Sequence, residues 1–205
     1  MKKIIFSIVI FTLLTMVSCN NNNQSAKEDH TLMNHDSTMP RQDNKMMDES
    51  VKMVSATFST VDVGVSTYMK SMLQNYLSTK NALIDGNPDK AASSGAAMYK
   101  AMKGFDKSLL TAEQKKVYDD IESDLKEHAE HIFKNKLDDQ REHFAMMSKD
   151  IYDLVKAFGA GLTLYHDHCP MFQDGSMWLS ESKDIRNPYY GENMMTCGTV
   201  EEMFK

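Results

Sequence analysis

The chain has 205 residues, of which 41% are hydrophobic and 25% are charged, and its formal net charge is −6. This composition is typical of a folded chain of about one domain with appendages, and it excludes a fully disordered or fibrous protein. An acidic chain has no basic excess with which to neutralise phosphates, so nucleic acid is not an expected partner. No glycine-rich dinucleotide or P-loop motif occurs. The unusual feature is sulfur: 18 methionines and 3 cysteines accompany 7 histidines.

The N-terminal residues resemble a bacterial export signal. Lys2 and Lys3 precede an apolar run over residues 4–14, which is shorter than the about 20 residues that a spanning helix needs, although a short membrane anchor is the alternative. Ser18 directly before Cys19 resembles a lipobox, so residues 1–18 are expected to be a lipoprotein signal peptide. Acyl chains, palmitate among them, on Cys19 would then hold the protein to a membrane of the cell envelope, facing the periplasm. Asn20, in place of an acidic residue, favours the outer membrane.

Residues 19–57 are expected to form a solvated tether. The stretch is polar, has few large aliphatic side chains and follows neither a helical nor a strand period. Histidine and methionine nevertheless recur in it at short spacing, at His30, Met33, His35, Met39, Met46 and Met47. Thioether and imidazole are ligands that suit copper, so the tether is a candidate for weak copper capture. The alternative to copper binding is that these histidines and methionines arose by compositional drift in a linker under no structural constraint.

Residues 58–163 are predicted to be helical. Apolar side chains recur at a spacing of three to four residues, and short breaks separate four such segments. Thr111 with Gln114 three residues later is typical of a capping box at a helix start. Short connections favour an all-α fold, an antiparallel four-helix bundle, with an irregular C-terminal segment packed on it. The methionines of these helices are interpreted as adaptable core filler.

Three histidines of the predicted helices are weaker candidates for a metal site. His128 and His131 are three residues apart and share a helix face, and His143 lies on the next helix. The order of residues fits neither a zincin motif nor the Glu-x-x-His pair of di-iron bundles. A structural or solvent-exposed role is therefore the alternative for His128 and His131.

The segment over residues 164–205 combines turn-forming residues with the two cysteines that remain after lipidation. Its soft donors are Cys169, Met171, Cys197, His166, His168, Met194 and Met195. If the two ends of the segment meet, these side chains favour Cu(I), with Zn(II) as the second choice. The alternative is a Cys169–Cys197 disulfide with no cofactor, which an oxidising compartment permits.

Several short motifs carry a resemblance to a known family. They are Cys169-Pro170-Met171, Trp178-Leu179-Ser180, the run over residues 185–191, Met194-x-x-Cys197-Gly198 and, upstream, Arg141-x-x-Phe144-x-x-x-Ser148. Together they resemble, over about residues 60–204, exported bacterial helical domains of unassigned biochemistry. Such domains also occur as the C-terminal tail of periplasmic adaptor subunits of heavy-metal efflux systems of the copper and silver type. The resemblance implies soft-metal handling, with Cys169, Met171 and Cys197 as the motif positions most able to bind a metal.

These observations predict a lipid-anchored protein that binds Cu(I) and buffers it or hands it over to efflux. Its partners would be the metal ion, the membrane through the acyl chains, and an efflux adaptor or another envelope protein. No catalytic motif stands out, so the protein is not expected to be an enzyme. The alternative is a structural or interaction module without metal, closed by the Cys169–Cys197 disulfide.

Overall fold

The computed structural model describes residues 51–205, and the predicted signal peptide, Cys19 and the histidines and methionines of the tether lie outside the described residues. Four helices follow one another: α1 (Val63–Ile84), α2 (Pro88–Lys103), α3 (Ala112–Lys134) and α4 (Leu137–Phe158). Four strands complete the described part: β1 (Lys52–Val54), β2 (Leu164–Cys169), β3 (Ser176–Ser180) and β4 (Thr199–Phe204). Two short 3-10 turns, η1 (Lys107–Leu109) and η2 (Gly191–Met194), lie in the connections.

The helix starts follow from local capping. The Asp62 carboxylate accepts a hydrogen bond from the Gly64 N–H before α1, and Pro88 occupies the first turn of α2. The predicted capping box of α3 is confirmed, because Thr111 and Gln114 each bond the other's backbone N–H. Four helices in the predicted region are therefore confirmed, and their antiparallel arrangement remains a prediction.

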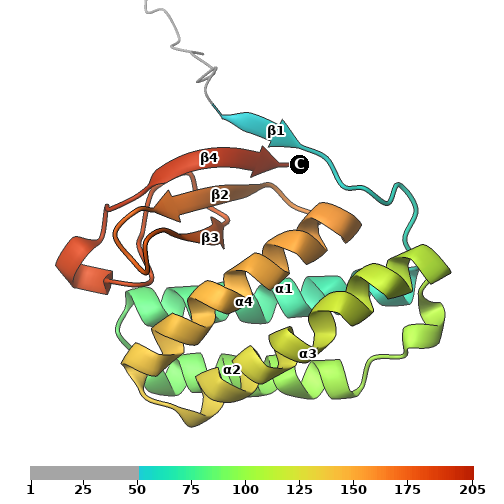
Figure 1. Cartoon of the computed structure of the whole chain (residues 1–205), viewed down its shortest axis with the longest axis horizontal. Coiled ribbons are helices and arrows are strands. Elements are labelled where there is room, and N and C mark those ends of the chain that lie inside the picture. Colours follow the sequence, from blue (N-terminus) through green and yellow to red (C-terminus); the bar gives the residue numbers. More distant parts are fainter. Residues whose placement is uncertain (1–50) are drawn as a thin grey trace, which may run out of the picture. The chain divides into compact units, whose positions relative to one another are not determined.

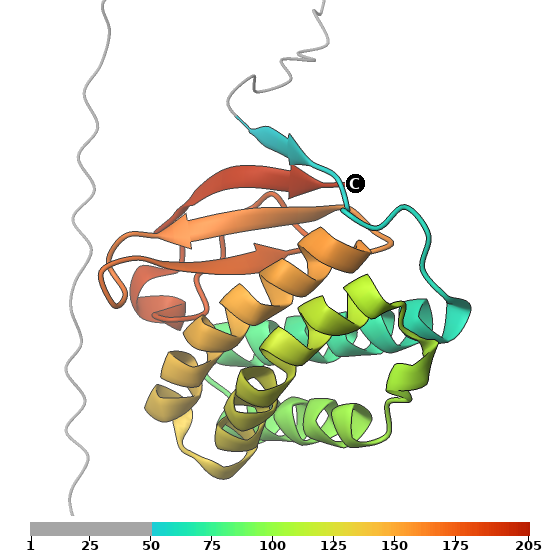
Figure 2. The same ribbon diagram turned by 45° about the vertical axis from the view of Figure 1, so that its right-hand side comes forward.

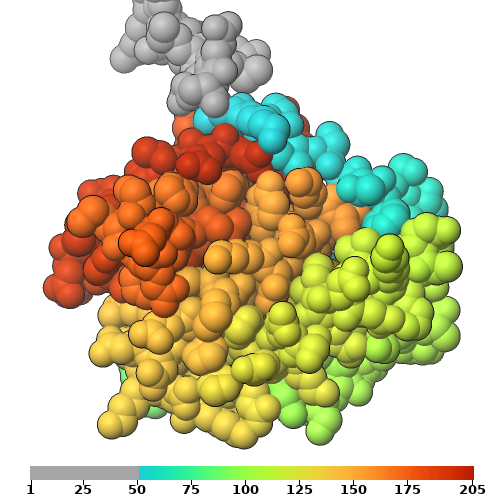
Figure 3. All heavy atoms as spheres, viewed as in Figure 1, coloured from blue at the N-terminus to red at the C-terminus, as the bar shows by residue number. Residues whose placement is uncertain are grey.

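The prediction of an all-α fold with an irregular C-terminal segment is wrong, because a four-stranded sheet is present. Its strand order is β1-β4-β2-β3; β1 pairs with β4 in parallel, and the other two pairings are antiparallel. Strand β1 lies inside the range assigned to the tether, residues 19–57, and runs along the surface beside β4 (Figure 3). The strands are three to six residues long, and β2 and β4 mix polar and apolar side chains at both sets of alternate positions, so they lack the hydrophobic alternation that identifies a strand in a sequence.

The sheet covers one side of the helical layer. In Figures 1 and 2 it lies over α1 and α4, with α2 and α3 on the side away from it. The buried core contains aromatic side chains and many methionines, and its helical methionines are Met69, Met72, Met98, Met102 and Met147. These methionines are core filler, as the sequence predicts. The rigid layer of helices thereby forms a platform for the C-terminal strands and loops.

Candidate functional site

Two thiols from separate segments meet at the edge of the sheet. Cys169 is the last residue of β2, and Cys197 lies two residues before β4. Their Sγ atoms are 3.5 Å apart, which is well beyond the about 2.05 Å of a disulfide bond, so both cysteines are free. Cys169 is fully buried, whereas Cys197 is partly exposed. The pair is therefore open to solvent from the side of Cys197.

Cys169 affects the ionisation of the Cys197 thiol. The hydrogen bond with Cys169, followed by burial and by charge repulsion from Cys169, raises the pKa of the Cys197 thiol above its ordinary value of 9.0. A proton thus stays on Cys197 at neutral pH. Because a metal ion binds the thiolate and not the thiol, metal binding here would release protons and strengthen as the pH rises.

A buried asparagine holds the loop that carries Cys197. The Nδ2 atom of Asn187 donates to the Cys197 carbonyl at 2.7 Å, and its backbone N–H donates to the Met195 carbonyl at 2.8 Å. Its Oδ1 atom accepts from the N–H groups of Tyr189 and Tyr190. Asn187 has no exposed surface, so nothing in solvent replaces these bonds. It is a positioning residue for the thiol pair, and its role depends on the fold of a loop whose bonds span two to ten residues, which the sequence does not show.

The residue after Cys197 must be glycine. Gly198 has a φ of +148°, and an added Cβ would lie 2.8 Å from the Trp178 ring and 3.0 Å from the His168 carbonyl oxygen. Trp178 is fully buried and its ring meets Tyr189 edge-on. The loop therefore approaches β2 and β3 closely at this point, and this close approach places Cys197 beside Cys169.

The helical motif that contributes to the family resemblance supports the same loop. Arg141 on α4 donates through Nε to the Pro188 carbonyl at 3.2 Å, next to Asn187. Further along α4, the Ser148 hydroxyl donates to the Phe144 carbonyl and lies 2.9 Å from the Tyr76 hydroxyl of α1. Tyr76 in turn accepts the backbone N–H of Leu179 in β3 at 2.9 Å. Two separate sets of hydrogen bonds thus connect the helices to this region: one runs from α4 to the loop beside Asn187, and the other runs from α4 through α1 to β3.

The structure separates the two predicted histidine ligands from the thiols. Within residues 51–205 neither His166 nor His168 joins Cys169 and Cys197 in a group of three or more possible metal ligands. His166 Nδ1 is 3.7 Å from the nearer carboxylate oxygen of Glu202, and His168 Nδ1 is 3.4 Å from that of Glu201. The single cluster of soft donors predicted from the sequence is therefore divided, and these histidines interact with carboxylates instead.

The predicted methionine ligands lie at or near the surface. Met171 is 60% exposed and Met194 is 36% exposed, whereas Met195 is partly buried. Met171 follows Cys169 by two residues in the chain. Met194 lies in the turn that the Cys197 N–H closes by donating to its carbonyl at 3.1 Å. Exposed thioethers therefore flank both cysteines in the sequence.

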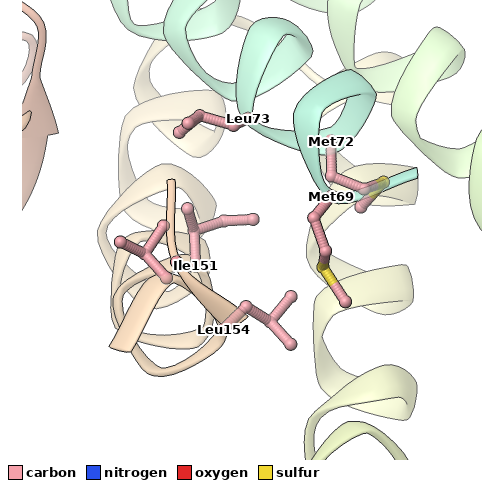
Figure 4. A pocket seen from close by; sticks show the side chains of 7 residues that line it. Met69, Met72, Leu73, Ile151 and Leu154 are labelled. Carbon is pink, nitrogen blue, oxygen red and sulfur yellow. The ribbon is translucent and has the colours of Figure 1, made fainter. Parts of the chain in front are cut away.

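A small apolar cavity lies between α1 and α4 (Figure 4). Its volume is about 10 Å³, and its lining includes Met69, Met72 and Leu154. This is space for about one water molecule, and the apolar lining offers no polar partners for it. The cavity is therefore a packing gap and not a ligand site.

Residues 72–163 match the family described as Protein of unknown function (DUF3347). The match shows a domain of unassigned function, as the sequence resemblance implies. It covers most of the helical layer and ends before Cys169 and Cys197. No curated protein and no solved structure matches the chain.

Two further findings concern residues 51–205. Within that range no group of three or more His, Cys, Asp or Glu side chains is arranged to hold a metal ion. No helix in the same range has the length and apolar character needed to cross a membrane.

Proposed function

We propose that the protein binds a soft metal ion, most favourably Cu(I), between the sulfurs of Cys169 and Cys197. The observation that carries the proposal is the 3.5 Å separation of two free thiols brought together from distant segments. Thiolates are soft ligands that select Cu(I) over hard cations. The buried Asn187 and the close approach at Gly198 hold the second cysteine in place, so the pair is organised before any metal arrives.

The small number of ligands favours Cu(I) over Zn(II). A structural zinc site takes four ligands in a tetrahedron, and within residues 51–205 no third His, Cys, Asp or Glu side chain joins the two thiols. Cu(I) forms stable complexes with two thiolates alone. The exposed thioethers of Met171 and Met194 are soft donors that could add to such a complex by turning toward it. Zn(II) is accordingly the second choice.

A closed disulfide is the second candidate, and the same short separation favours it. Oxidation of the pair would release two protons and pass two electrons to an oxidant, with a modest movement of the sulfurs. In this alternative the domain is an interaction module of an envelope or efflux assembly. Thiol counting on the protein isolated without reductant distinguishes the two, because the metal proposal requires both thiols to be free or metal-bound.

The wider context of the proposal rests on the sequence. The lipobox at Cys19 supports a lipid-anchored protein of the cell envelope that faces the periplasm, in the outer membrane by preference. The resemblance to efflux-adaptor tails supports buffering of copper or hand-over to efflux, with an adaptor as partner. Copper capture by the His and Met side chains of the tether would deliver ions to the thiol pair. No catalytic step is needed for this role.

A Cu(I) competition titration tests the proposal. The full chain carrying Cys19→Ser, in which Cys169 and Cys197 are the remaining thiols, is titrated against a chromophoric Cu(I) chelator under reducing conditions. We expect one tightly bound ion. Cys169→Ser or Cys197→Ser should weaken binding more than the roughly 10–100-fold that is lost when a residue that only supports a metal ligand is changed.

Met53→Leu is the matched control for the titration. It removes one sulfur that is 49% exposed on β1, and it should leave the tight component unchanged. Equal chelator competition by the parent and both cysteine variants would show that copper is held elsewhere and would refute the proposal.

A further inference from the structure

A second group of potential ligands lies between α3 and α4, in the helical layer. His128 on α3 and His143 on α4 point their Nδ1 atoms at each other, 3.3 Å apart. The ring of His131 stacks on that of His143 with the centroids 4.0 Å apart, while its own Nδ1 atom contacts Asn135 at 3.2 Å. The side chain of His128 is 13% exposed, whereas His143 is partly exposed. The pair of facing nitrogens is thus shielded on one side and reachable from the other.

The distance between the facing nitrogens suits a shared metal ion better than a shared proton. Hydrogen bonds from ring N–H groups typically measure about 2.7–3.2 Å, so 3.3 Å is long for one. Two nitrogens that each lie 2.0–2.1 Å from a tetrahedral ion are about 3.3–3.4 Å apart. The two rings therefore already have the spacing of two ligands in one coordination sphere.

The surroundings favour a cation at this position. Burial lowers the pKa of both His128 and His143, and the next contribution is the neighbouring imidazole, His143 for the first and His131 for the second. The rings are thus neutral at pH 7, which is the state that binds metal. Five carboxylates lie close enough to act on the histidines or to contact them: Asp124, Glu127, Asp139, Glu142 and Asp150.

One of these carboxylates is placed to support a bound imidazole. Asp150 Oδ2 lies 3.9 Å from His128 Nε2, on the side of the ring away from His143, and it is buried without a hydrogen-bond partner. Metal-bound imidazoles commonly donate their second N–H to a carboxylate. Binding at Nδ1 of His128 would fix the proton on Nε2 and give Asp150 the donor that it lacks.

We propose that His128 Nδ1 and His143 Nδ1 together bind one divalent transition-metal ion, with water completing the coordination. Imidazole ligands suit borderline ions such as Zn(II), Cu(II) and Ni(II) more than soft Cu(I). The site is distinct from the thiol pair in residues, elements and ligand chemistry. It uses two protein ligands, in keeping with the arrangement of the described residues.

The test uses the full chain with all three cysteines changed to serine, so the thiol site cannot contribute. This chain is titrated with Zn(II) against a chromophoric chelator at pH 7.5. His128→Gln and His143→Gln should each abolish the binding of one Zn(II) ion or weaken its affinity more than about tenfold. A loss of about tenfold is the smallest effect expected when a residue that only supports a metal ligand is changed. His168→Gln, which removes a partly exposed histidine of the sheet, is the matched control and should bind as the parent does.

A second measurement covers the case in which a histidine variant fails to fold. In the cysteine-free chain with its histidines intact, substoichiometric Zn(II) should shift the ring signals of His128 and His143 together in an NMR titration. Unchanged binding by both folded variants, an equal loss in His168→Gln, or ring shifts confined to other histidines would each overturn the proposal. None of these results would affect the thiol site, which this chain lacks.

Discussion

At the scale of single residues, the site consists of polar groups that hydrogen-bond to one another. The thiols of Cys169 and Cys197 share a hydrogen bond, and Asn187 uses its amide and its backbone to fix the loop beneath them. Asp167, between the two histidines on β2, differs because its carboxylate is fully buried, and Lys80 and the Trp178 indole are the groups that favour its ionised form. A buried carboxyl group makes the free energy of unfolding depend on pH, because its pKa differs between the folded and the unfolded chain.

Asp167→Asn should remove a pH dependence from the free energy of unfolding. Burial raises the pKa of Asp167 to about 8 from its ordinary value of 3.8, against the attraction of Lys80. Between these two values the unfolded chain is ionised while the folded chain keeps the proton. Stability contributed by this group is therefore present below pH 4 and is lost as the pH rises toward 8, by up to about 1.4 kcal/mol per pH unit.

Denaturant unfolding of the parent and of Asp167→Asn at pH 4.5, 6 and 7.5 measures this contribution. Asparagine has nearly the same shape as aspartate and does not titrate. The free energy of unfolding of the variant should therefore rise relative to that of the parent as the pH increases. A difference in unfolding free energy that stays constant across the three pH values would show that Asp167 ionises normally in the folded protein.

At the scale of elements, the thiol pair depends on the loop between β3 and β4. Arg141 holds this loop from α4, Asn187 closes it internally, and Gly198 lets it approach Trp178. The loop has little regular structure apart from η2 and no sheet partner of its own. Its conformation thus rests on side-chain bonds that single substitutions can remove.

Asn187→Ala should loosen the loop and weaken Cu(I) binding while both cysteines remain. Loss of the side chain leaves the Cys197 carbonyl and the N–H groups of Tyr189 and Tyr190 without their partner, at a cost of about 1–3 kcal/mol for each buried group left unsatisfied. We expect weaker chelator competition and faster alkylation of Cys197. Asn193→Ala, an exposed asparagine of η2, is the control, and an equal effect in both variants would show that Asn187 has no special role.

The elements also show what the sequence predicts and what it does not. The helices can be predicted from the sequence because hydrophobic periodicity and capping, as at Thr111, are local signals. Strand β2 is not readable, because Asp167 and His168 put polar groups on opposite faces and hide the alternation. The sequence shows that Cys169 and Cys197 lie 28 positions apart in one C-terminal segment, and the structure shows that they approach each other. The Asn187 bonds form inside one irregular loop, and the pairing of His128 with His143 joins two helices; neither leaves a periodic signal in the sequence.

At the scale of the whole molecule, the thiol pair can act as a cross-link. Closing it would join residues 28 positions apart and reduce the entropy of the unfolded chain. Oxidation should therefore stabilise the protein by about 3–4 kcal/mol in the chain-entropy account, a rise in Tm on the order of 10 °C. The oxidised form should also lose tight Cu(I) binding, because no thiolate remains.

Thermal unfolding of the oxidised and the reduced chain, followed by circular dichroism, tests this coupling. The Cys169→Ser variant treated with the same oxidant is the control and should show no rise in Tm. Retention of tight Cu(I) binding by the fully oxidised chain would contradict the assignment of the ion to this pair.

The most direct measurement is X-ray absorption at the copper edge of the Cu(I)-loaded full chain carrying Cys19→Ser, compared with the same chain carrying Cys169→Ser and Cys197→Ser. The account predicts a first coordination shell of thiolate sulfur in the former and its loss in the latter. Identical spectra from the two chains would show that the paired thiols do not hold the metal.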